Sequence, residues 1–405
     1  MATRKRLDLR KSTWICGATY SGNTRHGTSD IAVLRAGGTK IFLFEGGQDP
    51  DEMEALRKIL WERDEHVILS WLTPGELATI QPLLRDRKNF SIVGDDWWLM
   101  PYWYTREADY ILFRKYHGLA VRLGHLPFVN GDRPPLLVNP FPYQLSKYSM
   151  TISLLRPAAL AASPFLEVRN WWRKRSDPVV PEKCIYLPFG INAADVPLKN
   201  EKIQYDFGNT SGAMGLWFMR DPHAPARYTC ANLYHDRRRL VDLLASFEND
   251  PFAFYDCRRE KNYYMPWDLY LQKTQQCRFV VVSGGLHDAA LPKFLEYACM
   301  GVPMIGRAVP LEHPWQEDVI FPVDMMGVTR KQLKPLLLQA LERYPVMRER
   351  ALNGRERLLK LYHFDRILDM AQAQVDGQSI PTDYVRYPVT QASAHPSTPV
   401  EPAHN

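Results

Sequence analysis

Short apolar runs alternate with helical patterns along most of the chain, and this alternation starts twice. The first series begins with "TWICGA" at 13–18 and continues through "TKIFLFEGG", "HVILSWL" and "FSIVGDD". The second series begins after Asn200 with "IQYDFGNTSG" and continues through "PFAFYDC" and "CRFVVVSGG". Strands that are continuously apolar and separated by helices form parallel sheets covered on both faces. The sequence therefore predicts an α/β fold with two Rossmann-like domains facing each other across a cleft.

Changes in composition mark where these domains should begin and end. Residues 1–185 form the predicted N-terminal domain, and the stretch 186–200, with its proline, glycine and polar residues, is typical of a linker. The C-terminal domain is predicted at 201–346, followed by a helix, 347–373, that returns to the N-terminal domain. Residues 374–405 are rich in Pro, Ser and Thr and poor in core formers, which predicts an extended or disordered tail.

The composition indicates the cellular compartment but does not identify the binding partner. The 405 residues include 51 Lys and Arg against 45 Asp and Glu, a formal net charge of +6 that is spread along the chain. Such an excess is compatible with an anionic small ligand, nucleic acid or a membrane surface. The six cysteines form no C-x-x-C pair, which together with their apolar surroundings is typical of buried thiols in a reducing compartment. No apolar run of about 18 residues occurs, so we expect a cytoplasmic protein without a transmembrane segment.

The strongest candidate site follows the predicted strand at 278–283. Ligands of doubly wound sheets gather at the carboxyl ends of strands, and this strand ends in a polar, glycine-rich loop that contains Ser283, Gly284 and Gly285. Pro292 suits the first position of a helix, whose N–H groups, beginning near Leu291, can hold a phosphate. Glu296, about one turn further on, can accept hydrogen bonds from a pair of sugar hydroxyls.

The segment 288–306, "DAALPKFLEYACMGVPMIG", resembles the donor-binding segment of GT-B glycosyltransferases. The segment is similar to the family 4 type and to the spore-coat and exostosin-like branches in its pattern of residues. The pattern consists of an acid, seven residues, a glutamate, and a helix end of small residues before "GVP". The resemblance is best in the C-terminal half, from "YDFGNTSG" to "NGRERLLKLYHFDRI". It implies transfer of a sugar from a nucleotide-sugar donor, with UDP-sugar favoured, to an acceptor hydroxyl held by the N-terminal domain. It implies no cofactor besides this donor and no bound metal.

The resemblance also implies roles for individual residues. Glu296 matches the glutamate that binds the ribose, and Asp288 takes the place of an acid, normally Glu, that touches the donor sugar in retaining families. Gly208 and Gly212 match the glycine-bearing loop at which the diphosphate approaches the backbone. The cations that neutralise the diphosphate leaving group have no clean match, and the candidates for this role are Arg220, Arg227, Arg238 and Lys293.

Two stereochemical courses stay open. In a retaining enzyme Asp288 should contact the donor sugar, whereas in an inverting enzyme a base of the N-terminal domain must deprotonate the acceptor. The candidates for that base are Asp95 and Asp96, at the end of a strand, and His26, in the loop after the first strand. Asp49-Pro50-Asp51 imitates a metal-binding Asp-x-Asp, but its position between a strand and a helix favours a helix cap.

Other functions are compatible with the same residues. A GT-B-type sugar-nucleotide epimerase would bind the same donor but would need several acids and histidines around the sugar. A catalytically silent nucleotide-sugar-binding protein would bind without turnover, and the incomplete set of diphosphate-binding cations keeps this alternative open. The acceptor can be a glycan, a small molecule or a modified nucleic-acid base, because the aromatic-rich region 97–175 suits sugar rings and bases equally. Nucleic-acid binding would fall steeply with salt.

Overall fold

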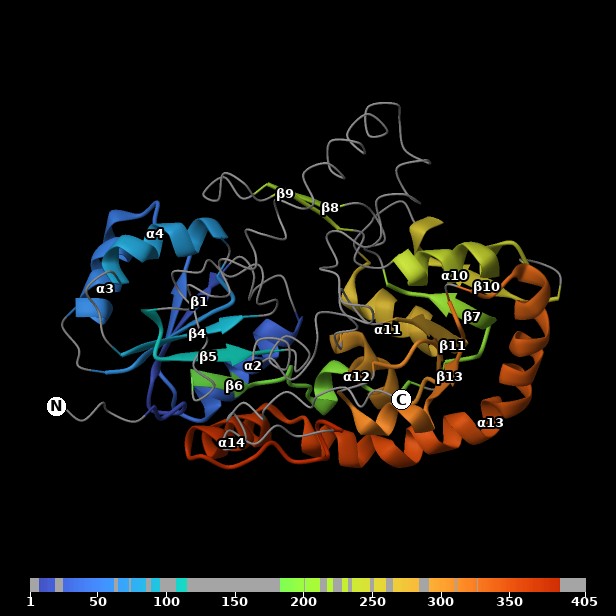
Figure 1. Ribbon diagram of the computed structural model, residues 1–405. Coiled ribbons are helices and arrows are strands. Elements are labelled where there is room, and N and C mark those ends of the chain that lie inside the picture. The colour runs from blue at the N-terminus through green and yellow to red at the C-terminus, as the bar shows by residue number, and fades with distance from the viewer. Residues whose placement is uncertain are drawn as a thin grey trace, which may run out of the picture.

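The computed structural model shows two α/β domains side by side, joined along one edge by the C-terminal helices (Figure 1). It describes residues 7–18, 25–61, 65–72, 74–84, 89–94, 107–114, 183–199, 201–211, 217–220, 228–231, 235–247, 251–259, 265–283, 291–309, 312–325 and 327–386.

The N-terminal domain is built on a six-stranded parallel sheet with the strand order β2-β1-β3-β4-β5-β6. Its strands are β1 (Thr13–Gly17), β2 (Ile41–Phe44), β3 (Val67–Ser70), β4 (Phe90–Gly94), β5 (Tyr110–Phe113) and β6 (Cys184–Tyr186). Its helices are α2 (Arg25–Ala36), α3 (Pro50–Trp61) and α4 (Pro74–Leu84). The strands β1 and β3 are buried at every position, as expected for a sheet covered on both faces.

The C-terminal domain is built on a five-stranded parallel sheet with the strand order β10-β7-β11-β12-β13. Its strands are β7 (Tyr205–Asn209), β10 (Phe254–Asp256), β11 (Cys277–Val282), β12 (Met304–Gly306) and β13 (Ile320–Pro322). Its helices are α10 (His235–Ala245), α11 (Trp267–Gln275) and α12 (Pro292–Cys299). An antiparallel pair, β8 (Trp217–Arg220) and β9 (Tyr228–Ala231), interrupts the alternation between β7 and α10.

Both sheets follow one winding rule. Numbered within its own domain, the second sheet has the order 2-1-3-4-5, and the first five strands of the N-terminal sheet have the same order. This is a doubly wound, flavodoxin-like arrangement, in which the strand order reverses between the first and third strands. The predicted fold class, α/β with two Rossmann-like domains, is confirmed.

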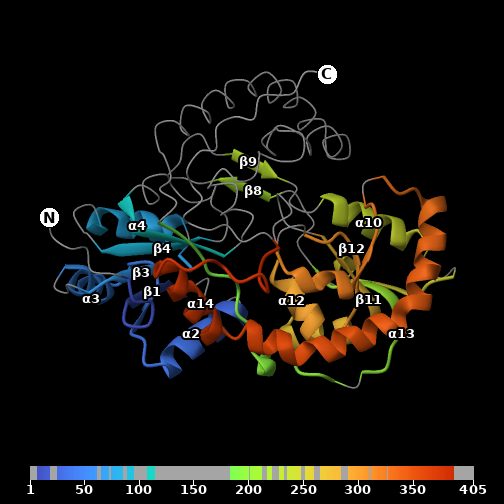
Figure 2. The same ribbon diagram turned by 60° about the horizontal axis from the view of Figure 1, so that its bottom comes forward.

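Two helices at the end of the described chain connect the domains. α13 (Arg330–Leu361) begins with a capping box between Thr329 and Gln332, and α14 (Phe364–Val375) follows it. α14 packs against α2 and β6, and the Gln374 amide bonds both the N–H and the C=O of Tyr186, each at 2.9 Å. Figure 2, in which this side of the molecule comes forward, shows α14 beside α2 of the first domain and α13 running along the second domain. The predicted returning helix at 347–373 is therefore two elements, the end of α13 and most of α14.

One apolar core runs through both domains. It includes Trp14 and Ile68 of the first sheet, Val280 and Phe294 of the second domain, and Tyr362 between α13 and α14. A second core lies between the C-terminal sheet, α10 and α13. Within the described part of the chain, no helix is long and apolar enough to cross a membrane.

Candidate functional site

The C-terminal sheet reverses its strand order between β7 and β11, and ligands of doubly wound sheets bind outside the strand ends at such a point. Thr210 and Ser211 follow β7, and Ser283 follows β11. All three side chains are buried, with exposures of 3%, 1% and 1%. Over the residues that the structure describes, the Ser283 hydroxyl has no hydrogen-bond partner. Hydroxyl groups therefore gather at the position where this fold binds ligands.

A hydroxyl network fixes this edge to the helices behind it. The Tyr297 hydroxyl of α12 lies 3.0 Å from Thr210 Oγ1 and 2.9 Å from Ser211 Oγ. Thr274 of α11 donates from its own hydroxyl to Thr210 Oγ1 at 3.1 Å. Because β7, α11 and α12 are tied together through side chains, the polar residues after β7 are held in one arrangement.

The helix α12 begins at the same edge. Leu291, its N-cap, has an extended backbone and makes no side-chain capping bond, and Pro292 occupies the first helical position. The first backbone N–H groups of the helix are consequently not capped by the preceding side chain. Pro292 has no N–H and the Phe294 N–H bonds the Leu291 carbonyl at 3.1 Å, so the attraction of this helix start for an anion comes mainly from the helix dipole.

Glu296 lies one turn inside α12 and is 3% exposed. The Tyr270 hydroxyl of α11 donates a hydrogen bond to Glu296 Oε2. Burial, and then the charge of Glu296, raise the pKa of the Tyr270 hydroxyl well above its ordinary value. Lys293, on the same side of α12, places its ammonium 4.0 Å from the centre of the Tyr270 ring. A carboxylate and an ammonium are thus organised around one buried tyrosine.

Cationic side chains surround the neighbouring end of β10. Burial and then the charge of Asp256 raise the pKa of the Cys257 thiol to about 11, and this rise is opposed by the charges of Lys293, Arg237 and Arg258. Arg258 is bound to Asp256 at 2.6 Å and to Asp242 at 2.7 Å. Arg237, on α10, is 3% exposed. This edge therefore combines buried hydroxyls, the Glu296 carboxylate, an Arg258 that is paired with Asp256 and Asp242, and the positive charges of Lys293 and Arg237, a set suited to a sugar linked to a phosphate.

The structure brings together the four predicted donor-binding residues that it describes on this edge: Ser283, Leu291, Lys293 and Glu296. Gly208 lies inside β7 rather than in the loop after it, and Cys277 Sγ fills the space that a side chain would need. The side chains of the remaining predicted residues are not described. Outside the described residues lie Gly212, Arg227, Gly284, Gly285, Asp288, Asp95 and Asp96. In α2, β8 and α10, with side chains that are not described, lie His26, Arg220 and Arg238.

Several residues of this edge were not predicted from the sequence: Thr210, Ser211, Arg237, Tyr270 and Tyr297. The sequence did contain a signal for Thr210 and Ser211 as site residues, because polar residues after an apolar strand mark its carboxyl end, where ligands bind. Arg237 also had one, since it precedes Leu240, Val241 and Leu244 at helical spacing and therefore lies on the buried face of α10. The sequence contained no such signal for Tyr270 and Tyr297, because each occurs in a pattern that is typical of an aromatic residue in the core.

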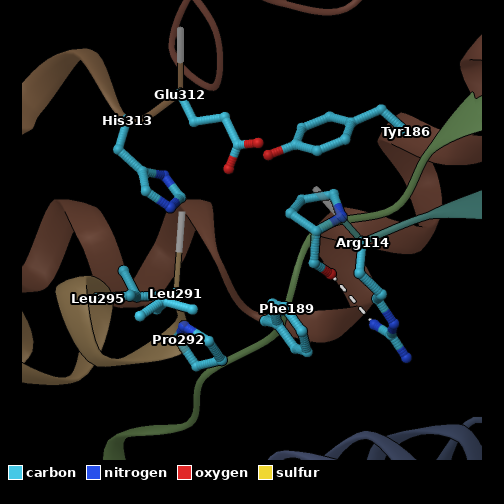
Figure 3. Close-up of a pocket in the computed structure, with 9 residues that line it drawn as sticks. Arg114, Tyr186, Phe189, Leu291, Pro292, Leu295, Glu312 and His313 are labelled. Carbon is cyan, nitrogen blue, oxygen red and sulfur yellow. Dashed lines mark hydrogen bonds between the residues drawn. The ribbon is translucent and has the colours of Figure 1, made fainter. Parts of the chain in front are cut away.

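A small pocket lies where the two domains meet (Figure 3). The N-terminal domain and the segment after it supply Arg114, Tyr186, Pro188 and Phe189, and the C-terminal domain supplies Leu291, Pro292, Leu295, Glu312 and His313. The Glu312 carboxylate and the Tyr186 hydroxyl point toward one another in this view. Because Leu291 and Pro292 also begin α12, the pocket adjoins the helix start described above.

The Asp49-Pro50-Asp51 sequence begins α3, as the capping interpretation predicted. Asp49 Oδ1 accepts a hydrogen bond from the Asp51 N–H at 2.9 Å, and the Asp49 carbonyl accepts one from Met53 at 3.1 Å. Within the described ranges, no group of three or more His, Cys, Asp or Glu side chains is arranged to hold a metal ion.

No family model and no curated protein matches the chain. Among solved structures, it is similar to Anabaena Alr3699/HepE in complex with UDP and glucose, with 10% identity, a TM-score of 0.47, and 91% of this chain and 100% of that chain covered. It is similar to sucrose-phosphate synthase from Thermosynechococcus elongatus, with 14% identity, a TM-score of 0.41 and coverages of 90% and 98%. It is also similar to a glycosyltransferase from Rickettsia africae ESF-5, with 9% identity, a TM-score of 0.45 and coverages of 90% and 98%. These values are too low to carry an argument about activity.

Proposed function

We propose that the chain is a glycosyltransferase that transfers a sugar from a nucleotide-sugar donor, with UDP-sugar favoured, to an acceptor hydroxyl without a bound metal. The observation that carries this proposal is the convergence of Glu296, Lys293 and the buried hydroxyls at the strand-order reversal of the second sheet. A protein of this fold binds ligands at that point, and the residues there match the chemistry of a nucleoside diphosphate. The sequence resemblance of the same segment to GT-B donor sites supports the assignment.

In this proposal each part of the donor meets a suitable group. The ribose hydroxyls donate to Glu296, because a carboxylate only accepts hydrogen bonds and has about four acceptor positions. Its Oε2 also accepts from Tyr270. The diphosphate lies at the start of α12, where the N–H groups and the Lys293 ammonium face negative charge. Ser283, whose buried hydroxyl has no hydrogen-bond partner among the described residues, follows β11 at the same edge of the sheet.

Breaking the bond between sugar and diphosphate leaves negative charge on the phosphate oxygens. Cations and helix dipoles already aimed at those oxygens stabilise the transition state more than the ground state, and this accelerates the reaction. Lys293 and Arg237 are the described cations that we assign to this task. The acceptor binds on the side of the N-terminal domain and can be a carbohydrate or another small molecule. We further propose a cytoplasmic enzyme, in which the five described cysteines stay as buried free thiols.

Calorimetric titration with UDP, GDP and ADP tests the donor assignment. We expect UDP to bind, and Glu296→Gln to weaken binding about tenfold or more, since a hydrogen bond to a charged group contributes roughly 1.5 to 3 kcal/mol. Lys293→Gln should weaken UDP more than uridine. The matched control is Lys273→Gln, because Lys273 also lies over tyrosine rings of this domain, at 5.7 and 5.4 Å, but on another helix.

Measurement of turnover distinguishes a glycosyltransferase from a protein that only binds the nucleotide-sugar. Release of UDP from a UDP-sugar, accelerated by an acceptor, supports the transferase. Tight UDP binding with no turnover of any UDP-sugar would favour the silent nucleotide-sugar-binding protein instead. If no nucleoside diphosphate binds, or if Lys273→Gln matches Lys293→Gln in its effect, the assigned donor site is wrong.

A further inference from the structure

We infer that Tyr270 is a positioning residue of the donor site: its hydroxyl orients the Glu296 carboxylate and its ring holds the Lys293 ammonium, so that one side chain aligns the ribose-binding and diphosphate-binding groups. This inference rests on the proposed function. Tyr270 comes from α11, whereas Glu296 and Lys293 come from α12. The alignment is therefore made between two helices that follow different strands.

The hydroxyl of Tyr270 can only act as the donor in its bond to Glu296. Tyr270 is 3% exposed, and burial together with the nearby carboxylate raises its pKa well above the ordinary value. The phenol therefore keeps its proton at neutral pH, and its O–H donates a hydrogen bond to Glu296 Oε2. A hydrogen bond to Oε2 limits the rotation of the carboxylate about its last torsion and so orients both of its oxygens.

The ring of Tyr270 is itself held in place. Trp267 lies 5.0 Å away and Tyr297 lies 6.2 Å away, measured between ring centres. Tyr297 is fixed in turn by Thr210 and Ser211, the residues that follow β7. The position of Tyr270 is thus coupled to the strand edge at which the donor should bind.

The ring face of Tyr270 is what orients Lys293. A lysine side chain is long and flexible, and an ammonium over an aromatic ring is attracted by the negative charge of its face. At 4.0 Å from the ring centre, the Lys293 ammonium is kept close to the start of α12. Removing the hydroxyl alone should release Glu296 and leave Lys293 in place, whereas removing the ring should release both.

Two substitutions separate these effects from a purely structural role. Tyr270→Phe should weaken UDP and uridine by the same factor, about tenfold, and should leave the affinity for 2′,3′-dideoxyuridine diphosphate unchanged, because that ligand has no ribose hydroxyls for Glu296 to accept from. Tyr270→Leu should weaken UDP further than uridine, because only UDP carries the diphosphate that Lys293 faces. The matched control is Tyr255→Phe, since Tyr255 is a buried tyrosine of the same domain whose hydroxyl contacts Met265 Sδ.

A double variant keeps the inference testable if Tyr270→Phe alone does not fold. Tyr270→Phe with Glu296→Gln removes both partners, so no buried charge loses its donor, and its UDP affinity should equal that of Glu296→Gln alone. A further loss in the double variant, or an equal loss for the dideoxy ligand, overturns the inference while the donor site stands. If the wild type binds GDP or ADP in place of UDP, the nucleoside, the diphosphate and the dideoxy diphosphate of that base replace the uridine ligands in these comparisons. Failure of the wild type to bind any of the three overturns the proposed function and the inference with it.

Discussion

His313 should make the stability of this protein fall in mild acid. Its side chain is buried beside Trp315 and Tyr362, with ring centres 5.2 Å away in each case. Trp315 Nε1 donates a hydrogen bond to the Tyr362 hydroxyl at 3.3 Å. His313 Nδ1 lies 2.6 Å from the same hydroxyl and accepts its hydrogen bond in the tautomer that carries the ring proton on Nε2. Protonation of Nδ1 would remove that acceptor. Burial lowers the pKa of His313 from 6.5 to about 3.

The sign and size of the effect follow from this shift. Above pH 6.5 the histidine is neutral in both the folded and unfolded states, so it contributes no pH dependence. Between pH 6.5 and about 3 the unfolded chain takes up a proton that the folded chain excludes. The free energy of unfolding then falls by up to about 1.4 kcal/mol for each pH unit. Between about pH 7 and pH 5 the loss from this one group is about 2 kcal/mol.

The substitution His313→Asn tests this account. His313 has a positive φ of 55°, a conformation that asparagine tolerates well, and the asparagine Oδ1 can accept from Tyr362 as Nδ1 does. Urea unfolding at pH 7, 6 and 5 should show a difference between pH 7 and pH 5 that is about 2 kcal/mol smaller in the variant. His363→Asn, at a side chain 45% exposed, controls for the loss of one histidine. An unchanged pH difference in His313→Asn would refute the reasoning.

Two further substitutions test the packing of the candidate site and of the returning helix. Gly208→Ala should lower the free energy of unfolding by about 1 to 3 kcal/mol, because the added methyl group meets Cys277 Sγ. In urea unfolding, adding Cys277→Ala to this variant should restore part of the loss. A double variant whose loss equals the sum of the two single losses would contradict this explanation. Gln374→Leu should release α14 from β6, because the Tyr186 N–H and C=O each lose a partner at about 1 to 3 kcal/mol per buried group. Hydrogen exchange in α14 should then rise while exchange in α12 does not, and equal protection in both proteins would speak against this connection.

The sequence was sufficient to predict β1 to β4 of the first sheet and β7, β10 and β11 of the second, because buried parallel strands are apolar at consecutive positions. The short strands β5, β12 and β13 were not predicted. The burial of every residue of β3, Val67–Ser70, illustrates this local signal. The start of α13 shows how competing signals mislead. Thr329 and Gln332 form a capping box, a pattern visible in the sequence as Thr-x-x-Gln. The predicted helix nevertheless began at 347, just after Pro345, where proline usually breaks a helix. In the structure the helix continues through Pro345.

The candidate site divides in the same way between local and distant residues. Ser283, Leu291, Lys293 and Glu296 were predicted because they follow one strand within a single short segment. Tyr270 reaches Glu296 across a separation of 26 residues. No periodic pattern distinguishes this tyrosine from one that only fills the core. Only the packing of α11 against β11 and of α12 against the same sheet brings the two side chains together.

The two domains have the same strand order, yet their points of strand-order reversal differ in chemistry, and this favours the second domain as the donor side. In the first domain β1 ends at Gly17, and the Trp71 carbonyl after β3 occupies the space that a side chain at Gly17 would need. The Arg114 guanidinium lies 4.8 Å above the Trp71 ring and forms an ion pair with Asp30 at 3.1 Å, with both side chains 1% exposed. Here the cation is already neutralised and covered by an aromatic ring.

In the second domain the corresponding point carries Ser283, whose hydroxyl has no hydrogen-bond partner in the described part of the chain, and Thr210 and Ser211, which follow the neighbouring strand β7. Among the described residues, Lys293 contacts an aromatic ring and forms no ion pair with a carboxylate, so within this part of the chain a phosphate can attract its ammonium without displacing an acid. A diphosphate at the first point would have to displace Asp30 from Arg114 and would meet a carboxylate there. The charge arrangement therefore favours the second sheet for the nucleotide in our proposal, with the acceptor on the side of the first domain.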